Sequence, residues 1–435
     1  MKSYKNFQAI KKCRSCSSKK LTKIFNLGHQ SFGGIFPSSK KQNVPTGPLE
    51  IVKCVKCSLF QLRHNFNRGK MFGRNYGYES GINKSMKKHL KDVVRHSLKI
   101  TSLKKNDAVV DIGSNDATLL NFFKSKEQKL YGIDPTINNK FKKYYNKKIN
   151  CISKLFDDIA ANDLKKKIKK AKIVYSIAMF YDLPDPIQFA KNIKKLISDN
   201  GIWVSEQSYC PFMLKNNSFD TICHEHLEYY TIKSLQSIFR RVGLKIVDIN
   251  FNDVNGGSFR VIASSSKSRF KEFNKLNLYL KKEKLLLRKY NFKKFIRNIN
   301  YIKNNLNNLL QRIYSANQNV YGYGASTKGN VLLQHFNITE KYLPLISEVN
   351  KFKFNRYTPL TKIKILNHNI VSKKLPNFFL VLPWHFKKNI LKKDIHILRK
   401  GTKYIFPLPK IKIYSYRKNK IIGRNYENFN RYSNI

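Results

Sequence analysis

Four of the seven cysteines form two pairs with the same spacing, Cys13-x2-Cys16 and Cys54-x2-Cys57. A CxxC turn lets two thiolates approach one ion, and two such turns complete a tetrahedral four-thiolate zinc site. Four protein ligands leave no open position on the ion, so we expect a structural zinc. Redox-active pairs and disulfides are the alternative interpretations. The other three cysteines lack ligand spacing and are interpreted as ordinary thiols: Cys151, Cys210 and Cys223.

A second group of candidate residues is the run His224, Glu225 and His226 in the segment FDTICHEHLEYY. Ionisable residues among aromatic ones are costly to bury, and such groups cluster at functional sites. An imidazole beside a carboxylate suits proton abstraction near neutral pH. The zinc-protease motif HExxH is excluded because its second histidine would fall on Glu228. Spacing alone favours a structural His/Glu network as much as catalysis.

A third candidate is the loop in DAVVDIGSNDATLL, which has the pattern of an apolar strand, a glycine turn and a helix. Gly113 allows close backbone approach, and Asp134, 21 residues later, could accept both hydroxyls of a ribose. The loop lacks the G-x-G-x-x-G motif of NAD enzymes, since Ala117 stands where a glycine is usual. A single-glycine loop with an acidic second-strand tip is typical of class I S-adenosylmethionine (SAM) methyltransferases. An ordinary strand–turn–helix without a ligand is the alternative.

The elements that must position these residues alternate between strands and helices. Apolar strand segments occur in DAVVDIG, LYGIDPT, AKIVYSIAMFYDL and NGIWVSEQSY, and the amphipathic stretch INKSMKKHLKDVVRHSLKI precedes them. Repeated βα units predict a parallel, doubly wound sheet that binds ligands at the carboxyl ends of its strands.

The C-terminal part has its own strand–glycine–helix unit, NVYGYGASTKGNVLLQ. In isolation it suggests a phosphate cradle at a helix N-terminus with Lys328 as counter-charge, although packing glycines give the same pattern. The stretch KEFNKLNLYLKKEKLLLRKY has apolar residues at helical spacing and predicts a packing helix. The tail segment YRKNKIIGRNYENFNRYSNI, residues 416–435, is polar and basic, and we expect it to be loosely ordered.

Charge and composition limit the function classes. Lys and Arg total 85 against 26 Asp and Glu, a net charge of +59 that would attract nucleic acid, anionic lipid or phosphorylated ligands. The lysines are spread along the chain with Asn and Ile, as A/T-rich codons would give, and no nucleic-acid recognition motif accompanies them. No apolar run is long enough for a membrane span, and the N-terminus has no signal-peptide pattern. We therefore expect a cytoplasmic protein without a specific nucleic-acid partner.

Together these segments resemble the family of SAM-dependent sugar C-methyltransferases, which alkylate the ring carbon beside the keto group of nucleotide-linked keto-deoxysugars. The resemblance runs nearly end to end, from Cys13 to Pro409. Besides the paired cysteines it rests on FGRNYGYESG, VDIGSNDATLL, FDTICHEHLEYYT, NGGSFRV, VYGYGASTKGN, RYTPLTKIKI and VLPWH. The combination of HEH with GYGASTKGN is specific, because single-domain methyltransferases carry neither.

The resemblance implies an α/β fold in which a class I methyltransferase Rossmann-like sheet is flanked by an N-terminal zinc-binding module and a C-terminal Rossmann-like α/β domain. The expected boundaries are 1–70 for the zinc module, 71–268 for the methyltransferase domain with its lid loop and helix, 269–410 for the C-methyltransferase domain and 411–435 for the tail. The implied cofactors are SAM and a structural Zn²⁺, and the implied partner is a nucleotide-linked keto-deoxysugar. We further expect a monomer or weak homodimer whose product enters a surface polysaccharide.

The family's functional residues carry over to matching positions. Its zinc ligands match the four paired cysteines. Its SAM loop matches Asp111, Gly113 and Asn115, beside Asp116, and its ribose contact matches Asp134. His226 matches the general base, with Glu225 as its partner. The base would remove the proton beside the ketone, and the resulting enolate carbon would attack the SAM methyl group.

Other implied roles are less specific. The enolate oxygen needs a hydrogen-bond donor, for which His224 or Tyr229 could serve. Loop tyrosines of the family that close over the active site match Tyr76 and Tyr78. Residues expected near the nucleotide or diphosphate of the substrate are Ser258, Arg260, Ser326 and Lys328.

Two departures from the family pattern affect the mechanism. Cys223 stands where relatives tend to have tyrosine, so a phenolic proton relay is not assumed. Phe180-Tyr181-Asp182 stands where many relatives have Asn or His near the methyl donor.

Two other function classes stay open. One is a non-catalytic sugar-nucleotide-binding relative, and the other is a nucleic-acid methyltransferase, although the chain lacks an Asn-Pro-Pro-Tyr type motif.

Overall fold

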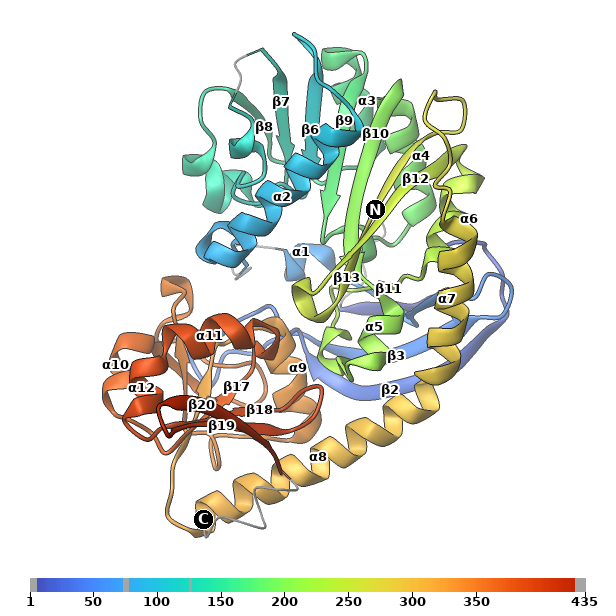
Figure 1. The fold of residues 1–435 in the computed structure, drawn as a ribbon. Coiled ribbons are helices and arrows are strands. Elements are labelled where there is room, and N and C mark those ends of the chain that lie inside the picture. The colour runs from blue at the N-terminus through green and yellow to red at the C-terminus, as the bar shows by residue number, and fades with distance from the viewer. Residues whose placement is uncertain (1–5, 73–77, 125–126, 427–435) are drawn as a thin grey trace.

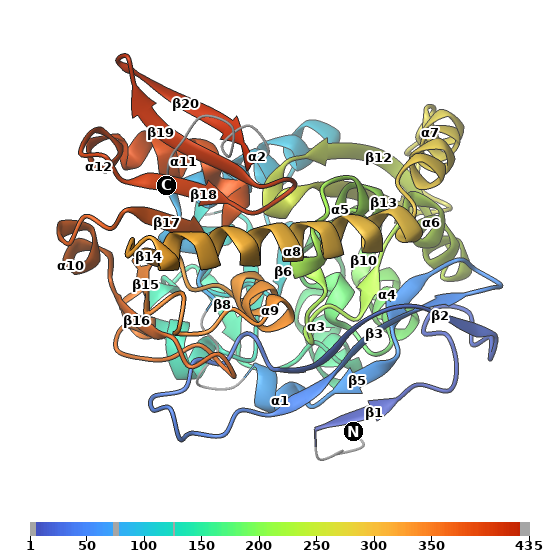
Figure 2. The same ribbon diagram turned by 90° about the horizontal axis from the view of Figure 1, so that it is seen from below.

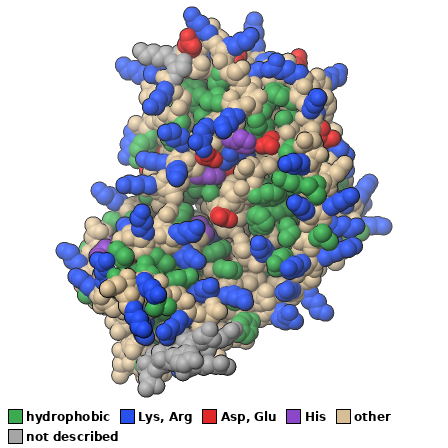
Figure 3. Space-filling view, viewed as in Figure 1, with side chains coloured by type: hydrophobic (Ala, Val, Ile, Leu, Met, Phe, Trp, Pro, Cys, Tyr) green, Lys and Arg blue, Asp and Glu red, His purple; other side chains and the backbone are tan. Residues whose placement is uncertain are grey.

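The computed structural model describes residues 6–72, 78–124 and 127–426 of the 435-residue chain. They form three larger sheets, which we call the N-terminal, central and C-terminal sheets (Figure 1). Across these residues, we find no helix with the length and apolar character to cross a bilayer. On the face in Figure 3, lysine and arginine side chains are spread over the whole surface instead of forming one patch.

The central sheet has the strand order β12-β13-β10-β9-β6-β7-β8. Its strands are β6 (Ala108–Ile112), β7 (Lys129–Ile133), β8 (Ile149–Ile152), β9 (Ala171–Ile177), β10 (Ile197–Ser208), β12 (Leu244–Asn252) and β13 (Ser258–Ser265). The first five are parallel, as predicted, and β13 is inserted antiparallel between β10 and β12. The associated helices are α2 (Lys84–Ile100), α3 (Asp158–Ile168), α4 (Pro186–Leu196) and α6 (Ile232–Arg241).

Local sequence accounts for these elements. All five residues of β6 are buried, as a central parallel strand requires. Helix α4 begins where Asp185 accepts the amide N–H of Gln188 and Pro186 occupies the first turn. Because Ile112 pairs with Ile133, the residues that follow β6 and β7 meet at one edge of the sheet. That edge carries the predicted cofactor loop.

The N-terminal sheet contains one strand from a distant part of the chain. Strands β2 (Leu21–Ser31), β3 (Thr46–Cys54) and β4 (Phe60–Leu62) are antiparallel, and β11 (Glu228–Tyr229) pairs with β4. Strand β1 (Phe7–Ala9) pairs separately with β5 (His64–Phe66), which is followed by α1 (Arg68–Met71). The N-terminal sheet is therefore completed by the segment that directly follows the HEH run.

The C-terminal sheet has the order β16-β15-β14-β17-β18-β19-β20. Its strands are β14 (Val320–Tyr323), β15 (Leu345–Glu348), β16 (Lys364–Asn367), β17 (Phe378–Val381), β18 (Lys403–Phe406), β19 (Lys412–Arg417) and β20 (Lys420–Asn425). The first five are parallel, as expected of a Rossmann-like unit. The expectation of a loosely ordered tail is wrong for residues 416–425, because the end of β19 and all of β20 extend the sheet as a hairpin.

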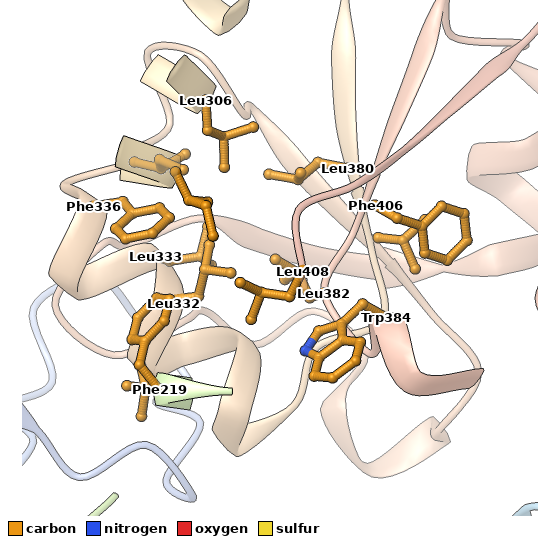
Figure 4. Close-up of a cluster of buried hydrophobic side chains, with 14 of the residues drawn as sticks. Phe219, Leu306, Leu332, Leu333, Phe336, Leu380, Leu382, Trp384, Phe406 and Leu408 are labelled. Carbon is orange, nitrogen blue, oxygen red and sulfur yellow. The ribbon is translucent and has the colours of Figure 1, made fainter. Parts of the chain in front are cut away.

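Long helices tie the C-terminal sheet to the rest of the chain. The helices of this half are α7 (Leu276–Lys289), α8 (Phe292–Ser315), α9 (Thr327–Phe336), α10 (His368–Lys373), α11 (Lys387–Lys393) and α12 (Ile395–Arg399), and α5 (Cys210–Lys215) precedes the HEH run. Helix α8 crosses the molecule from α7 to β14 (Figure 2), and its apolar side joins a core that extends from the N-terminal sheet to the C-terminal sheet. In that core Phe219 packs on Phe336 with ring centroids 4.9 Å apart (Figure 4). The segment leading to the HEH run is thus packed directly on α9.

Candidate active site and zinc site

The four paired cysteines come together as predicted. Their sulfur atoms all lie within 4.8 Å of one another, and the Cys13–Cys57 and Cys16–Cys54 pairs are each 3.5 Å apart. Zinc–sulfur bonds of about 2.3 Å in a tetrahedron separate the sulfurs by about 3.8 Å, so the donor set fits Zn²⁺. Gln61 Nε2 donates a hydrogen bond to Cys13 Sγ at 3.2 Å, a contact that favours the thiolate. These four thiolates would hold the zinc as a structural ion.

The cofactor loop, which directly follows β6, packs against the end of β7. Gly113 has φ +75°, and a Cβ there would lie 3.1 Å from Met179 Cγ, so a side chain would be strained and crowded. The N–H of Asn115 donates to Asp134 Oδ2 at 3.0 Å, and the N–H of Thr136 donates to Asp134 Oδ1 at 2.8 Å. The sequence prediction that Gly113, Asn115 and Asp134 share one site is consistent with these contacts.

Acidic side chains dominate this loop. Burial raises the pKa of Asp111 well above its usual range, and the charges of Asp134 and Asp116 raise it further. Burial also raises the pKa of Asp134. Repulsion among three carboxyl groups is relieved by a cation, and SAM carries a sulfonium and an ammonium group. The loop therefore has the chemistry to accept SAM.

The segment before α2 is fastened to this loop. The N–H of Ser80 donates to Asn115 Oδ1 at 3.0 Å, and the N–H of Gly81 donates to Asp116 Oδ2 at 2.6 Å. Tyr78 lies at the start of this segment with 46% of its surface exposed. Tyr76, predicted to be catalytic, lies outside the described residues. Asp116 thus holds the segment that approaches the cofactor loop.

His226 has the tautomer that a general base requires. Its Nδ1 lies 2.8 Å from the carbonyl oxygen of Thr221, which can only accept, so Nδ1 carries the proton and Nε2 has the free lone pair. Burial lowers the pKa of His226 to about 4, and the charge of Lys328 contributes. The ring packs on Tyr181 with centroids 4.2 Å apart. His226 is therefore neutral at physiological pH.

Glu225 is not the group that orients His226, contrary to the sequence prediction. Its carboxyl lies against the connection between β2 and β3, where a Cβ on Gly34 would be 2.5 Å from Glu225 Oε1. Burial raises the pKa of Glu225, and its Oε2 has no hydrogen-bond partner among the described residues. The orienting role belongs to the carbonyl group of Thr221, which no sequence pattern identifies.

The side chain of His224 also lies away from His226 and is buried against the N-terminal sheet. Its Nε2 donates to the carbonyl of Gly47 at 3.1 Å, and its ring packs between Phe32 and Phe66 at 4.6 and 4.8 Å. Tyr229 is buried in β11, and its hydroxyl has no hydrogen-bond partner in the described chain. Both positions suit packing, and neither supports the prediction of a donor to the enolate oxygen.

Lys328, predicted to bind substrate, does approach the HEH run. Ser326 caps α9 by accepting the N–H of Gly329 at 3.0 Å, and Lys328 Nζ donates to the carbonyl of Asn255 at 2.6 Å. The Lys328 charge lowers the pKa of His226, as noted above, and opposes the rise that burial causes in the pKa of Asp220. The C-terminal half thus brings one cation to the candidate base.

Arg260 is a correction to the predicted substrate residues. Its guanidinium is buried on β13, where Nε donates to Glu206 Oε2 at 2.9 Å and one terminal nitrogen contacts His96 Nδ1 at 3.1 Å. His89 contacts the other Glu206 oxygen. Arg260 therefore stabilises the packing of α2 on the sheet. The hydroxyl of Ser258 also has a partner within the chain, since it donates to the carbonyl of Val254 at 2.9 Å.

Several residues near Lys328 were missed at the sequence level as individual site residues. Trp384 Nε1 donates to Asp220 Oδ2 at 2.9 Å, which joins the VLPWH motif to the turn before His226. His385 beside it has a buried Nδ1 without a hydrogen-bond partner in the described part of the chain, and burial lowers its pKa well below the usual range. The VLPWH motif was noticed in the sequence, but nothing in the sequence indicated that its tryptophan contacts Asp220.

The chain matches three family models in succession. Residues 13–72 match the model described as "Putative zinc binding domain", residues 83–249 match "Methyltransferase domain" and residues 253–409 match "C-methyltransferase C-terminal domain". Among curated proteins, C-methyltransferase NovU of Streptomyces niveus is 25% identical over 410 residues, which cover 93% of this chain and 97% of NovU.

Solved structures match a smaller part of the chain. A SAM-dependent methyltransferase from Anabaena variabilis is 15% identical with a TM-score of 0.33, covering 40% of this chain and 83% of that one. A Bacillus halodurans protein described as a methyltransferase is 11% identical with a TM-score of 0.32, covering 42% of this chain and 99% of that one.

Proposed function

We propose that this chain, a class I SAM-dependent methyltransferase with zinc as its second cofactor, methylates a ring carbon beside the keto group of a nucleotide-linked keto-deoxysugar. Transfer to carbon is supported by the match of residues 253–409 to the C-methyltransferase model and by the similarity to NovU over nearly the whole chain. The sugar substrate is our proposal and follows from the family resemblance together with the chemistry of the site.

The observation that carries this proposal is the neutral imidazole of His226. A ketone acidifies the hydrogen on the neighbouring carbon, so a base with a free lone pair can remove that hydrogen and leave an enolate. His226 Nε2 is such a base, because its Nδ1 proton is held by the Thr221 carbonyl. SAM, when bound, would supply the methyl group to the enolate carbon, with its methyl–sulfur bond broken and S-adenosylhomocysteine leaving. His226 then holds the abstracted proton on Nε2.

Lys328 supplies the charge that the enolate requires. Its ammonium disfavours the imidazolium form of His226, so the same field favours an anion formed beside that ring. We therefore assign Lys328 to the stabilisation of the enolate or of an anionic substrate group. At the other side of the site, Asp134 would accept the ribose hydroxyls of SAM, with Asp111, Gly113, Asn115 and Asp116 around it.

The test is mass spectrometry of the full chain incubated with SAM and a panel of nucleotide-linked 4-keto-6-deoxy sugars. We expect one sugar to gain one methyl group, and His226→Gln to reduce the rate by about 10²- to 10⁴-fold while SAM still binds. His396→Gln, on α12, is the matched control and should retain the wild-type rate.

The other outcomes discriminate between function classes. SAM binding without a methylated sugar would contradict the proposed substrate, and methylation of DNA or RNA would identify a nucleic-acid methyltransferase. Sugar-nucleotide binding without any turnover would identify a non-catalytic relative. Binding and turnover are therefore measured on the same preparation.

A further inference from the structure

Strand β11 is the outer strand of the N-terminal sheet and also the continuation of the HEH run. Glu228 and Tyr229 pair with Gln61 and Phe60 of β4. The residue before β11, Leu227, is held from both sides. Its carbonyl accepts the N–H of Leu62 at 2.8 Å, and its own N–H donates to the carbonyl of Tyr181 at 2.7 Å. The position of His226 therefore depends on where the N-terminal sheet holds β11.

Arg14 links this strand to the zinc site. It lies between the zinc ligands Cys13 and Cys16, and its buried guanidinium donates to the carbonyl of Leu62 at 2.6 Å and to the carbonyl of His64 at 2.9 Å. Its Nε lies 3.5 Å from Glu228 Oε1. One side chain of the first cysteine pair thus contacts both strands of the β4–β11 pair.

Glu228 depends on that contact. Its carboxyl is buried, and neither oxygen has a hydrogen-bond partner among the described residues. Burial raises the pKa of Glu228 well above its usual range, and the charge of Arg14, whose Nε lies 3.5 Å away, opposes that rise. Removing Arg14 would leave the buried Glu228 carboxyl without this neighbouring cation, and removing Glu228 would take an acidic partner from the buried Arg14 guanidinium; either loss is destabilising. Arg14 therefore stabilises Glu228, two residues after His226, in the place where β11 holds it.

A second path runs through Gln61. Its Nε2 donates to the zinc ligand Cys13, its Oε1 accepts the backbone N–H of Arg14 at 3.1 Å, and its backbone pairs with Glu228. The Cys13–Cys16 turn carries the Arg14 side chain, and it also carries the Arg14 N–H and the Cys13 sulfur that contact Gln61, so its conformation controls both paths. Four ligands on one ion would fix that conformation.

We propose that zinc binding positions the catalytic base, with Arg14 and Glu228 as the positioning residues that connect the Cys13–Cys16 turn to His226. The inference rests on the proposed function, because it takes His226 as the base. It goes beyond a structural zinc in one respect. Loss of the metal is expected to release the HEH run before it affects the cofactor loop, which is held by Asp134 in the central sheet.

Hydrogen–deuterium exchange of the full chain tests this without a substrate. The readouts are peptides covering residues 222–231 and peptides covering the cofactor loop, 108–118. In Glu228→Gln and Arg14→Gln, and after removal of zinc with a chelator, we expect exchange in 222–231 to rise about tenfold while 108–118 changes less than about twofold. Glu50→Gln is the matched control in the same sheet, because Glu50 pairs with Lys23 at 3.4 Å at the surface.

A double-mutant cycle separates positioning from simple destabilisation. If Arg14 and Glu228 act as one pair, the variant with both changes should exchange no faster in 222–231 than either single variant. SAM affinity should stay within about twofold in all of them, while turnover falls in kcat. Additive losses, or unchanged exchange in 222–231 after zinc removal, would overturn the inference.

Uniform loss of protection in both peptides would also overturn it, because zinc would then stabilise the whole chain. The inference and the proposed function can fail separately. If exchange responds as expected but no sugar is methylated, the coupling stands and the substrate is wrong. If a sugar is methylated and exchange does not respond, the substrate stands and the coupling is wrong.

Discussion

The cofactor loop and the HEH run are held by contacts of very different range along the chain. In the loop, Asn115 is bound by Asp134, 19 residues away, and Ser114 contacts Tyr145, 31 residues away. In the segment around the HEH run, His224 is bound to Gly47, 177 residues away, and Asp220 is bound to Trp384, 164 residues away. The loop is a local structure of one sheet. The base lies where the HEH run meets the N-terminal sheet and the C-terminal half, and we call this place the junction.

This difference implies that SAM binding and proton abstraction can be impaired independently. Changes in the loop should act on cofactor affinity, and changes at the junction should act on turnover at saturating cofactor. Each experiment below either separates the two regions or shows that they are not separable.

The largest effect is expected for Asp134→Asn. The carboxylate accepts two backbone N–H groups and is our candidate for the ribose contact, so its loss removes charge-assisted hydrogen bonds. We expect SAM affinity to fall about 10- to 100-fold by isothermal titration calorimetry. Asp199→Asn, at the start of β10, is the control on the same sheet and should bind SAM normally. Wild-type affinity in Asp134→Asn would contradict the cofactor site.

Much of the fold and of the cofactor site was predictable from sequence because the determining contacts are local. The apolar strand before Gly113, the acid at Asp134 and the two CxxC turns each combine a residue type with a short spacing. The parallel sheets followed from alternating apolar strands and helices. The basic tail was mispredicted, because a polar hairpin gains its place by pairing with β18 and not from its own pattern.

The sequence identified candidate residues of the junction, but it did not predict which of them contact one another. Adjacent positions suggested that Glu225 supports His226, yet the two side chains point to different partners, Gly34 and Thr221. Arg260 has the charge to bind a diphosphate, but its partner Glu206 lies on a neighbouring strand. Sequence identifies such groups by type, and their roles depend on which element is packed against them.

An intermediate effect is expected for Gly34→Ala. The new Cβ would lie 2.5 Å from Glu225 Oε1, so the N-terminal turn or the HEH run must shift. We expect kcat to fall about tenfold with SAM affinity unchanged, since small displacements of a positioned base are costly. Gly69→Ala is the matched control in α1, where the nearest atom to the new Cβ is 3.4 Å away. Equal loss of SAM affinity and turnover would show that the two regions are one unit.

The smallest effect is expected for mild acidification, and it examines the junction alone. A histidine with an ordinary pKa near 6.5 would lose about tenfold of its neutral form at pH 5.5. Burial and the Lys328 charge lower the pKa of His226 to about 4. Because the lowered pKa keeps the ring unprotonated above about pH 4, turnover should change less than about twofold between pH 7.5 and 5.5, and then fall as the pH approaches 4.

The rate is measured by mass spectrometry at saturating SAM, with circular dichroism at each pH to confirm that the chain is folded. In Lys328→Met the decline should begin at a higher pH, because the cation that opposes protonation is gone. A wild-type decline centred near pH 6.5 would mean that the base is solvated, and that the junction does not hold it as the structure describes.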